Sequence, residues 1–196
     1  MLLNYQLLIL QLMSEMKKDN ALESYLSFRL GDEIFALNVE KVHKILELQK
    51  ITEVPRAPDY MKGVINLRGD VLPVVDTRIK FGLPSGETTK NTSILVVEAE
   101  IAGDLVMLGM LVDAVNSVLK IELEDLLPPP SLGNQYKSGF ISNMARVKDK
   151  FFIILNIDAV FSTDDYINLK DLKGFREQKE STDETQEEEK SMNNQS

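Results

Sequence analysis

The sequence lacks cysteine and contains a single histidine, His43. Without cysteine there are no disulfides, thiolate zinc sites, iron–sulfur clusters or cysteine nucleophiles, and one histidine excludes a histidine-rich metal site. Positive charge is also in deficit, because 22 Lys+Arg stand against 31 Asp+Glu in 196 residues. A nucleic-acid-binding protein neutralises phosphates with surplus Lys and Arg, so this balance argues against that class. The composition indicates a soluble, acidic, intracellular protein that is poor in catalytic residue types.

No hydrophobic run is long enough to cross a membrane. The apolar run at residues 1–13 is interrupted by three amide side chains and is shorter than the roughly 20 residues of a spanning helix. It also lacks the basic start and small-residue cleavage site of a signal peptide. Two interpretations stay open: a short amphipathic helix, or upstream sequence that precedes a true start at Met13 or Met16. Residues 1–24 are therefore treated as an N-terminal extension without an assigned function.

The other end of the chain is polar and acidic. Residues 176–196 contain seven acidic and three basic residues, with no aromatic residue after Phe175. A segment with this charge and so little apolar surface cannot offset the entropy of ordering. We therefore predict that residues 173–196 form a disordered acidic tail, and that the domain they follow is only mildly acidic.

The region between these ends, residues 25–172, has the pattern of an antiparallel β-protein. Turn residues separate pairs of short apolar runs, which predicts four hairpins: 25–30 with 33–39, 64–67 with 71–76, 93–99 with 105–112, and 140–147 with 151–156. Hairpins at this spacing favour small barrels over βαβ units. Short helices are expected at 40–47, 77–81 and 122–127, and a longer one at 158–172.

The two halves of this region follow the same order. Each has a hairpin, a Val-x-x-Val step, a glycine that opens a second hairpin, and an aspartate before a helix. This predicts two similar barrel subdomains at roughly 25–85 and 92–161. Units this small lie near the lower limit of independent stability, so we expect them to share a core or exchange strands, with a groove between them.

No catalytic motif is present. The sequence contains no phosphate-binding loop, dinucleotide fingerprint or His-Glu-x-x-His helix. His43 lies between two lysines and is interpreted as a surface or half-buried residue, and Asp76 and Asp113 as helix caps. An enzyme that used carboxylates alone would need burial or a like-charged neighbour to raise their pKa, and no such pair is evident. We therefore predict a protein that is not an enzyme and needs no cofactor.

Several segments carry a resemblance to a known family. They are residues 60–83 with the run Asn66-Leu67-Arg68-Gly69, the lead-in at 54–58, the opening at 25–33, and Gly-Met-Leu-Val-Asp-Ala-Val at 109–115. In this order and spacing they resemble the CheW-like domains of bacterial chemotaxis adaptors, over roughly residues 25–169. The resemblance implies an all-β fold with a few short helices: two small SH3-like, five-stranded β-barrels packed together, plus a C-terminal helix.

The resemblance also implies a function. Members of this family are non-catalytic scaffolds that couple the cytoplasmic tips of chemoreceptors to the regulatory domain of the histidine kinase CheA. We thus expect a cytoplasmic protein, monomeric alone, that is recruited to membrane-associated receptor arrays without inserting into the membrane or binding nucleic acid. An adaptor of a pilus-type motility pathway is the alternative.

Site residues follow from the same resemblance. The receptor-binding groove is expected at Val42, Lys44, Gly63, Arg68, Gly109 and Val115, and the kinase contacts at Val71, Pro73, Leu127 and Leu132. Other roles stay open for some of them: the two valines of the groove set suit a core, and its two glycines suit a strained turn or bulge. At Lys44 the family often has glutamate, which puts the charge pairing with a receptor in doubt.

Overall fold

The computed structural model describes residues 22–129, 139–161 and 165. These residues form eleven strands, one α-helix and three short 3₁₀ helices: β1 (Leu22–Leu30), β2 (Glu33–Asn38), η1 (Val39–Lys41), β3 (Val42–Glu47), β4 (Met61–Leu67), β5 (Asp70–Asp76), α2 (Thr77–Lys80), β6 (Ser93–Ile101), β7 (Asp104–Val112), β8 (Ala114–Glu122), η2 (Leu123–Asp125), β9 (Leu126–Leu127), β10 (Ile141–Val147), β11 (Lys150–Leu155) and η3 (Ile157–Ala159). The acidic tail, most of the N-terminal extension and the expected C-terminal helix beyond residue 161 lie outside the described residues, except for Asp165.

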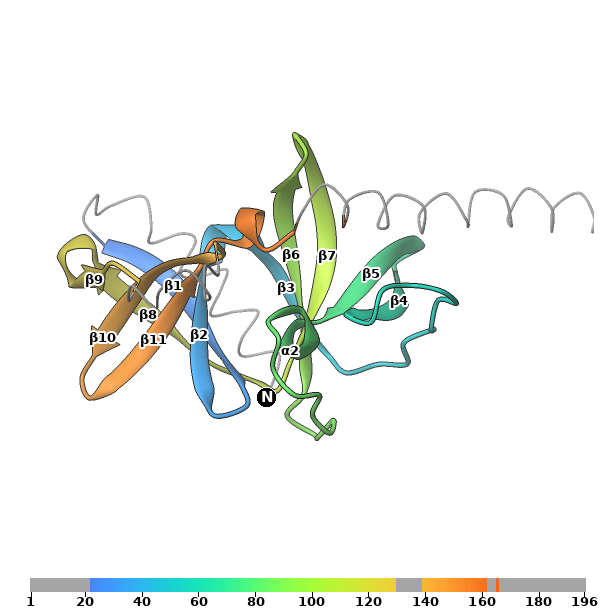
Figure 1. Cartoon of the computed structure of the whole chain (residues 1–196), viewed down its shortest axis with the longest axis horizontal. Coiled ribbons are helices and arrows are strands. Elements are labelled where there is room, and N and C mark those ends of the chain that lie inside the picture. The colour runs from blue at the N-terminus through green and yellow to red at the C-terminus, as the bar shows by residue number, and fades with distance from the viewer. Residues whose placement is uncertain (1–21, 130–138, 162–164, 166–196) are drawn as a thin grey trace, which may run out of the picture.

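The strands form two sheets (Figure 1). Sheet A has the order β8-β1-β2-β11-β10-β9, and sheet B has the order β3-β6-β7-β5-β4. Within each sheet the hairpins meet through a short parallel contact, β2 with β11 and β5 with β7. The expected β-fold is confirmed, with the difference that the two-residue strand β9 gives sheet A a sixth member.

The sheets take strands from both halves of the chain. The first half runs β1 to β5 and the second runs β6 to β11, which preserves the repeat seen in the sequence. Hairpin β1–β2, however, pairs with strands of the second half, and hairpin β6–β7 pairs with strands of the first. The ranges 25–85 and 92–161 therefore each contribute to both sheets, because the two N-terminal hairpins are exchanged.

All four predicted hairpins are present, and their turns are alike. Each turn has two residues, and the first has a positive φ: Gly31 at 61°, Arg68 at 58°, Ala102 at 54° and Lys148 at 57°. Such turns match the right-handed twist of the flanking strands, and glycine or asparagine usually occupies them. Three of the four hairpins thus hold a residue other than glycine in a left-handed conformation.

The helix expected at residues 40–47 is wrong. Only η1 is helical, and β3 follows it as a strand paired with β6. The pairing shifts between Val42 and Lys44, so His43 is bulged out and Val42 and Ile45 both face the core. A bulge in a strand thus imitates the three-residue spacing of a helix. The expectation at 77–81 is confirmed by α2, whose N-cap is Asp76.

The helix expected at residues 122–127 is only partly correct. The 3₁₀ helix η2 covers its centre, but strand β9 follows and the long strand β8 precedes it. The β8 pattern is interrupted by a bulge opposite Ser27. The Ser27 hydroxyl fills that bulge: it donates to the Ser117 carbonyl at 2.7 Å and accepts from the Ser117 amide at 3.2 Å. Asp113, expected as a helix cap, instead precedes a strand.

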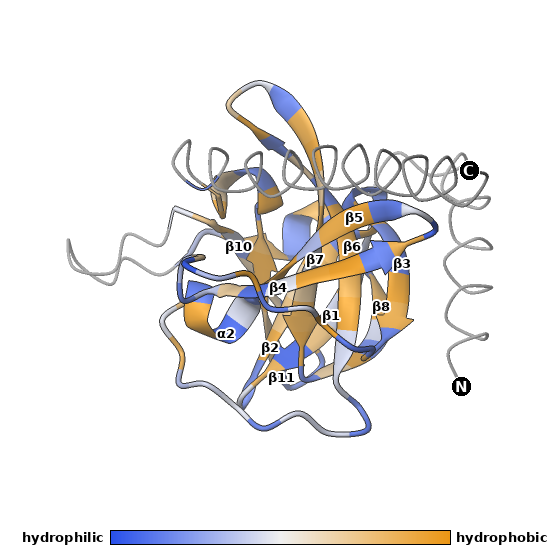
Figure 2. Cartoon of the chain, turned by 90° about the vertical axis from the view of Figure 1, so that its right-hand side faces the viewer, coloured by the Kyte–Doolittle hydropathy of each residue, from blue (hydrophilic) through white to orange (hydrophobic). Residues whose placement is uncertain are grey.

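The buried apolar side chains form three clusters. One lies on the inner side of sheet A and includes Phe152 and Ile154, and a second lies on the inner side of sheet B and includes Leu72 and Ile94. The largest cluster lies between the sheets, which therefore share a core. Figure 2 shows the apolar residues along the strands and the polar ones concentrated at turns and loops. Within the described residues, no helix is long and apolar enough to cross a membrane.

Candidate protein-binding surfaces

The hairpin β4–β5 projects from sheet B. Strand β7 pairs with β5 only from Val74 to Asp76, so no described strand pairs with the outer edge of β5 from Asp70 to Pro73. The Asn66 side chain accepts a hydrogen bond of 2.9 Å from the Gly69 amide and closes the turn. Arg68 is exposed at the tip of this hairpin. The turn therefore presents a guanidinium, and the strand next to it presents a free backbone edge.

Of the expected kinase contacts, Val71 is half-buried on this hairpin and Pro73 is buried. A proline suits an edge position, because it has no N–H to leave unpaired. Leu127 lies at the far edge of sheet A with 47% of its surface exposed. Leu132 lies outside the described residues. The described kinase-contact candidates are thus divided between the two sheets. Each sheet carries one candidate with a partly exposed apolar side chain, Val71 on sheet B and Leu127 on sheet A.

Two of the expected groove residues are glycines in tightly packed places. A Cβ on Gly63 would lie 2.2 Å from the Thr52 carbonyl oxygen, and its φ is 142°. A Cβ on Gly109 would lie 2.7 Å from a methyl group of Ile94 in the core of sheet B. Neither position has space for a side chain. The local packing by itself therefore explains both glycines.

The other expected groove residues differ in exposure. Val42 is 4% exposed and belongs to the core between the sheets. Lys44 and Val115 are half-buried, on strand β3 and near the start of β8. The bulge places His43 on the surface, where its Nε2 lies 3.6 Å from Glu98. Lys44, Val115 and Arg68 are thus the groove candidates with side chains that reach the surface.

The sequence analysis missed three exposed apolar residues. Leu105 follows the tip of hairpin β6–β7, Leu123 opens η2, and Phe151 is near the start of β11, with 66%, 53% and 57% of their surface exposed. The Arg146 guanidinium lies 5.9 Å from the centre of the Phe151 ring. Leu105 and Phe151 each follow a predicted turn by one or two residues, so both were expected to lie on strands. The sequence does not tell which face of a strand other strands cover, so their exposure could not be predicted.

An ion pair joins the two sheets next to α2. Arg78 donates from Nε to Asp113 at 2.7 Å and from Nη2 to the second carboxylate oxygen, and these hydrogen bonds raise the Arg78 pKa above its ordinary value. Asp113 is the single residue between β7 of sheet B and β8 of sheet A, and it also accepts from the Gly31 amide at 2.6 Å. Asp113 therefore links the connection between the two sheets both to α2, through Arg78, and to the turn of hairpin β1–β2, through Gly31.

Aromatic residues and a second ion pair reinforce this junction. The Phe81 ring, at the end of α2, lies 4.5 Å from Phe140 and 5.6 Å from Phe35 between ring centres. Lys80 bonds Asp165 at 2.8 Å and lies 4.3 Å from the centre of the Tyr60 ring. The short helix α2 thus connects sheet B to sheet A and to Asp165. These contacts hold hairpin β4–β5 of sheet B in a defined orientation relative to sheet A.

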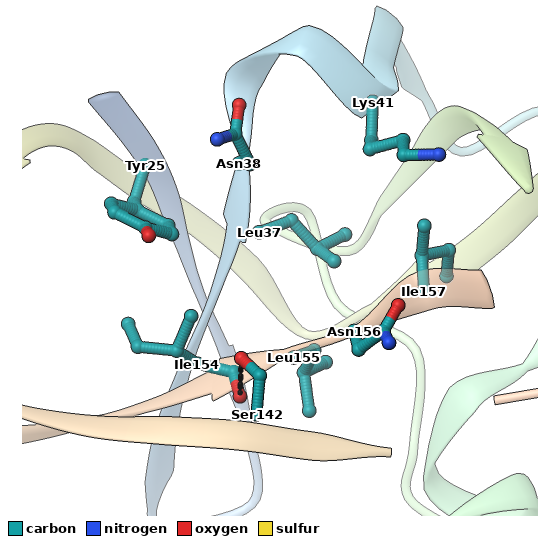
Figure 3. A pocket seen from close by; sticks show the side chains of 9 residues that line it. All are labelled: Tyr25, Leu37, Asn38, Lys41, Ser142, Ile154, Leu155, Asn156 and Ile157. Carbon is teal, nitrogen blue, oxygen red and sulfur yellow. Dashed lines mark hydrogen bonds between the residues drawn. The ribbon is translucent and has the colours of Figure 1, made fainter. Parts of the chain in front are cut away.

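A pocket of about 200 Å³ opens where β2 and β11 diverge (Figure 3). Its polar groups are already in use. Asn38 caps η1, Asn156 caps η3, Ser142 donates to the Ile154 carbonyl, and Lys41 lies 2.8 Å from Asp158. The Tyr25 hydroxyl donates to Glu23, and burial together with that hydrogen bond raises its pKa. This pocket is therefore explained by strand ends and their caps.

Comparison with known proteins decides the family. The model of the CheW-like domain matches residues 24–165, which is most of the chain and includes both sheets. The chain belongs to the CheW-like domain family. A chemotaxis protein CheW of Rhizobium meliloti is 31% identical over 71% of this chain and 88% of its own length. One of Bacillus subtilis is 30% identical over 70% of this chain and 86% of its own length.

A solved structure supports the same assignment. The scaffolding protein TtCheW of Thermoanaerobacter tengcongensis is similar with a TM-score of 0.63 and 32% identity, over 71% of this chain and 92% of that one. This CheW-like chain is thus related to scaffold and chemotaxis proteins across nearly their full length. The family resemblance predicted from the sequence is confirmed.

Proposed function

We propose that this CheW-like chain is a non-catalytic adaptor that couples chemoreceptors to the histidine kinase CheA. The observation that carries the proposal is the family match over residues 24–165, to a family in which one solved member is titled a scaffolding protein. The partly exposed Val71 and Leu127 and the free strand edge of β5 provide surfaces of the kind that protein partners cover. An adaptor of this kind works in the cytoplasm, next to the membrane that holds the receptors.

The two partners would contact different residues, although both sets include positions on hairpin β4–β5. The kinase regulatory domain would contact hairpin β4–β5 at Val71 and Pro73 and the edge of sheet A at Leu127. Leu132, which lies outside the described residues, is proposed as a further kinase contact. A receptor tip would contact the region of Arg68, Lys44 and Val115. A guanidinium forks onto a carboxylate with two hydrogen bonds, so Arg68 suits an acidic receptor residue. The junction at α2 keeps these surfaces at a constant angle, as a scaffold requires.

Calorimetric titration with the CheA regulatory domain of the same organism tests the kinase half. Saturable one-to-one binding is expected for the full chain. Val71→Glu puts a carboxylate into the expected contact and should weaken binding by about tenfold or more. Leu105→Glu makes the same change on a more exposed residue of hairpin β6–β7, and its affinity should stay within about twofold of the parent.

Two results would contradict the proposal. No binding at tens of micromolar would remove CheA as the partner, and binding to the kinase of a pilus-type pathway would then assign the alternative. Equal losses in V71E and L105E would move the contact away from hairpin β4–β5. Co-sedimentation with receptor-containing membranes tests the receptor half separately, with Arg68→Ala expected to lower the bound fraction.

A further inference from the structure

A second and larger pocket opens at one end of sheet A. Its volume is about 560 Å³, and four strands and one turn contribute to it: the lining residues are Ser27, Arg29, Asp32, Ile34, Val115, Asn116, Ser117, Lys150 and Phe152. Phe152 and Ile34 belong to the inner cluster of this sheet. The pocket is thus the open mouth of the small barrel, with an apolar floor and a polar rim. Such mouths are frequent binding sites in β-barrels.

The rim carries two available positive charges. Arg29 on β1 and Lys150 at the start of β11 are both exposed, and neither forms an ion pair within the described part of the chain. Among the described lining residues Asp32 is the one acid. The pKa of Arg78 is raised mainly by its hydrogen bonds to Asp113 and to a lesser degree by the negative charge of Asp32. By contrast, Lys41 at the other pocket is already paired with Asp158. The mouth therefore has the chemistry to bind carboxylates.

This chain itself contains a segment with the matching charge. Residues 176–196 contain seven acidic and three basic residues, including the run Glu187-Glu188-Glu189. We propose that the acidic segment 176–196 docks in the mouth of sheet A, with its carboxylates on Arg29 and Lys150. The proposal concerns an interaction within the chain and does not depend on which partners the adaptor has.

The tether makes this contact feasible. Glu187 is 22 residues beyond Asp165, which allows a span of up to about 70 Å, several times the radius of gyration of about 15 Å expected for a domain of this size. A tethered segment has an effective concentration in the millimolar range. Ion pairs between exposed groups are weak between separate molecules. Within one chain, the high effective concentration allows those between the acidic segment and Arg29 or Lys150 to form for a substantial fraction of the time. Their dependence on salt is the expected signature.

Docking there would have a consequence for the proposed function. Val115 lines the mouth and is also an expected residue of the receptor groove. A docked segment would cover that part of the groove, and a receptor would have to displace it. The following experiment measures the intramolecular contact with no partner present, so its failure is distinct from a failure of the adaptor proposal.

The absence of native cysteine permits a direct test. A nitroxide on Ser191→Cys of the full chain broadens amide signals of nearby residues in a ¹H–¹⁵N spectrum. At about 20 mM NaCl we expect loss of the amide signals of Arg29, Ser117 and Lys150, while those of strand β4 remain. At about 0.5 M NaCl, where the screening length falls to about 4 Å, the signals should return.

Charge reversal identifies the contact. In the R29E/K150E double variant the signal loss at the mouth should disappear, and adding E187K/E188K/E189K should restore it. The K50E/K62E double variant makes the same change in charge at two exposed positions away from the mouth, one in the loop after β3 and one on β4 of sheet B, and should keep the parent pattern. Chemical-shift dispersion of each variant reports whether it is folded. Uniform broadening, no broadening, or a loss that persists in a folded R29E/K150E would overturn the proposal.

Discussion

Replacing Gly63 with alanine tests whether this glycine serves the fold or a partner. The new Cβ would lie 2.2 Å from the Thr52 oxygen and 2.8 Å from a methyl group of Ile51, at a φ of 142°. Backbone strain of this kind costs about 1–3 kcal/mol. To relieve the clash, Thr52 must also leave Val64, with which it exchanges two backbone hydrogen bonds of 2.9 and 2.8 Å, each contributing about 0.5–1.5 kcal/mol. The free energy of unfolding should therefore fall by about 2–6 kcal/mol.

Urea unfolding followed by circular dichroism measures this change. Gly103→Ala is the matched control, because Gly103 also has a positive φ, 85°, but a Cβ there meets nothing within 4 Å. It carries the backbone strain without the clash and should cost about 1–2 kcal/mol. If G63A unfolds with the same free energy as G103A, the packing argument is refuted, and a role of Gly63 in partner binding becomes the better explanation. If G63A is much less stable, a loss of receptor binding in that variant says nothing about direct contact.

Three further predictions concern single residues. Arg68→Gly relieves the left-handed strain at the β4–β5 turn and should raise the melting temperature slightly, whereas Arg68→Ala should leave it nearly unchanged; a large fall in either would make the side chain structural. Asp113→Ala leaves the Arg78 guanidinium and a backbone amide without their acceptor, so denaturant unfolding should show a loss of about 2–4 kcal/mol, while the double variant D113A/R78M should recover part of it. Tyr25 has a raised pKa in the folded protein, mainly through burial and then through Glu23. Its contribution to stability is therefore complete below the unfolded pKa of about 10 and decreases as the pH rises above it. Tyr25→Phe should remove part of the alkaline loss of stability, and an unchanged pH profile would contradict the assignment.

Local signals predicted the hairpins but not their partners. Each turn is encoded within a few residues, such as Gly31-Asp32 or Arg68-Gly69, and all four were found. Strands β3 and β8 were missed because each contains a bulge, and a bulge breaks the two-residue alternation by which a strand is recognised. The exchange of hairpins β1–β2 and β6–β7 was left open, because two similar halves have similar apolar faces and either pairing satisfies the pattern.

The site residues could be named from the sequence but not placed on a surface. Gly63 and Gly109 belong to the same motifs as Arg68 and Val115, yet the first two face packed interior atoms and the last two reach the surface. Burial depends on which strand lies opposite, and the local sequence does not contain that information. The mouth of sheet A was missed for the same reason, since Arg29, Val115 and Lys150 lie far apart in the chain and meet only in the folded sheet.

The exchange of hairpins determines the order in which the sheets can form during synthesis. The strands of sheet B run without interruption from β3 to β7, residues 42–112, so this sheet can assemble once that stretch has left the ribosome. Sheet A needs β1 and β2 together with β11, and must wait until Leu155 has been made. For about forty residues of translation the apolar hairpin β1–β2 therefore lacks β11, the strand that pairs with β2, and a nascent chain in that interval presents apolar surface to chaperones and proteases.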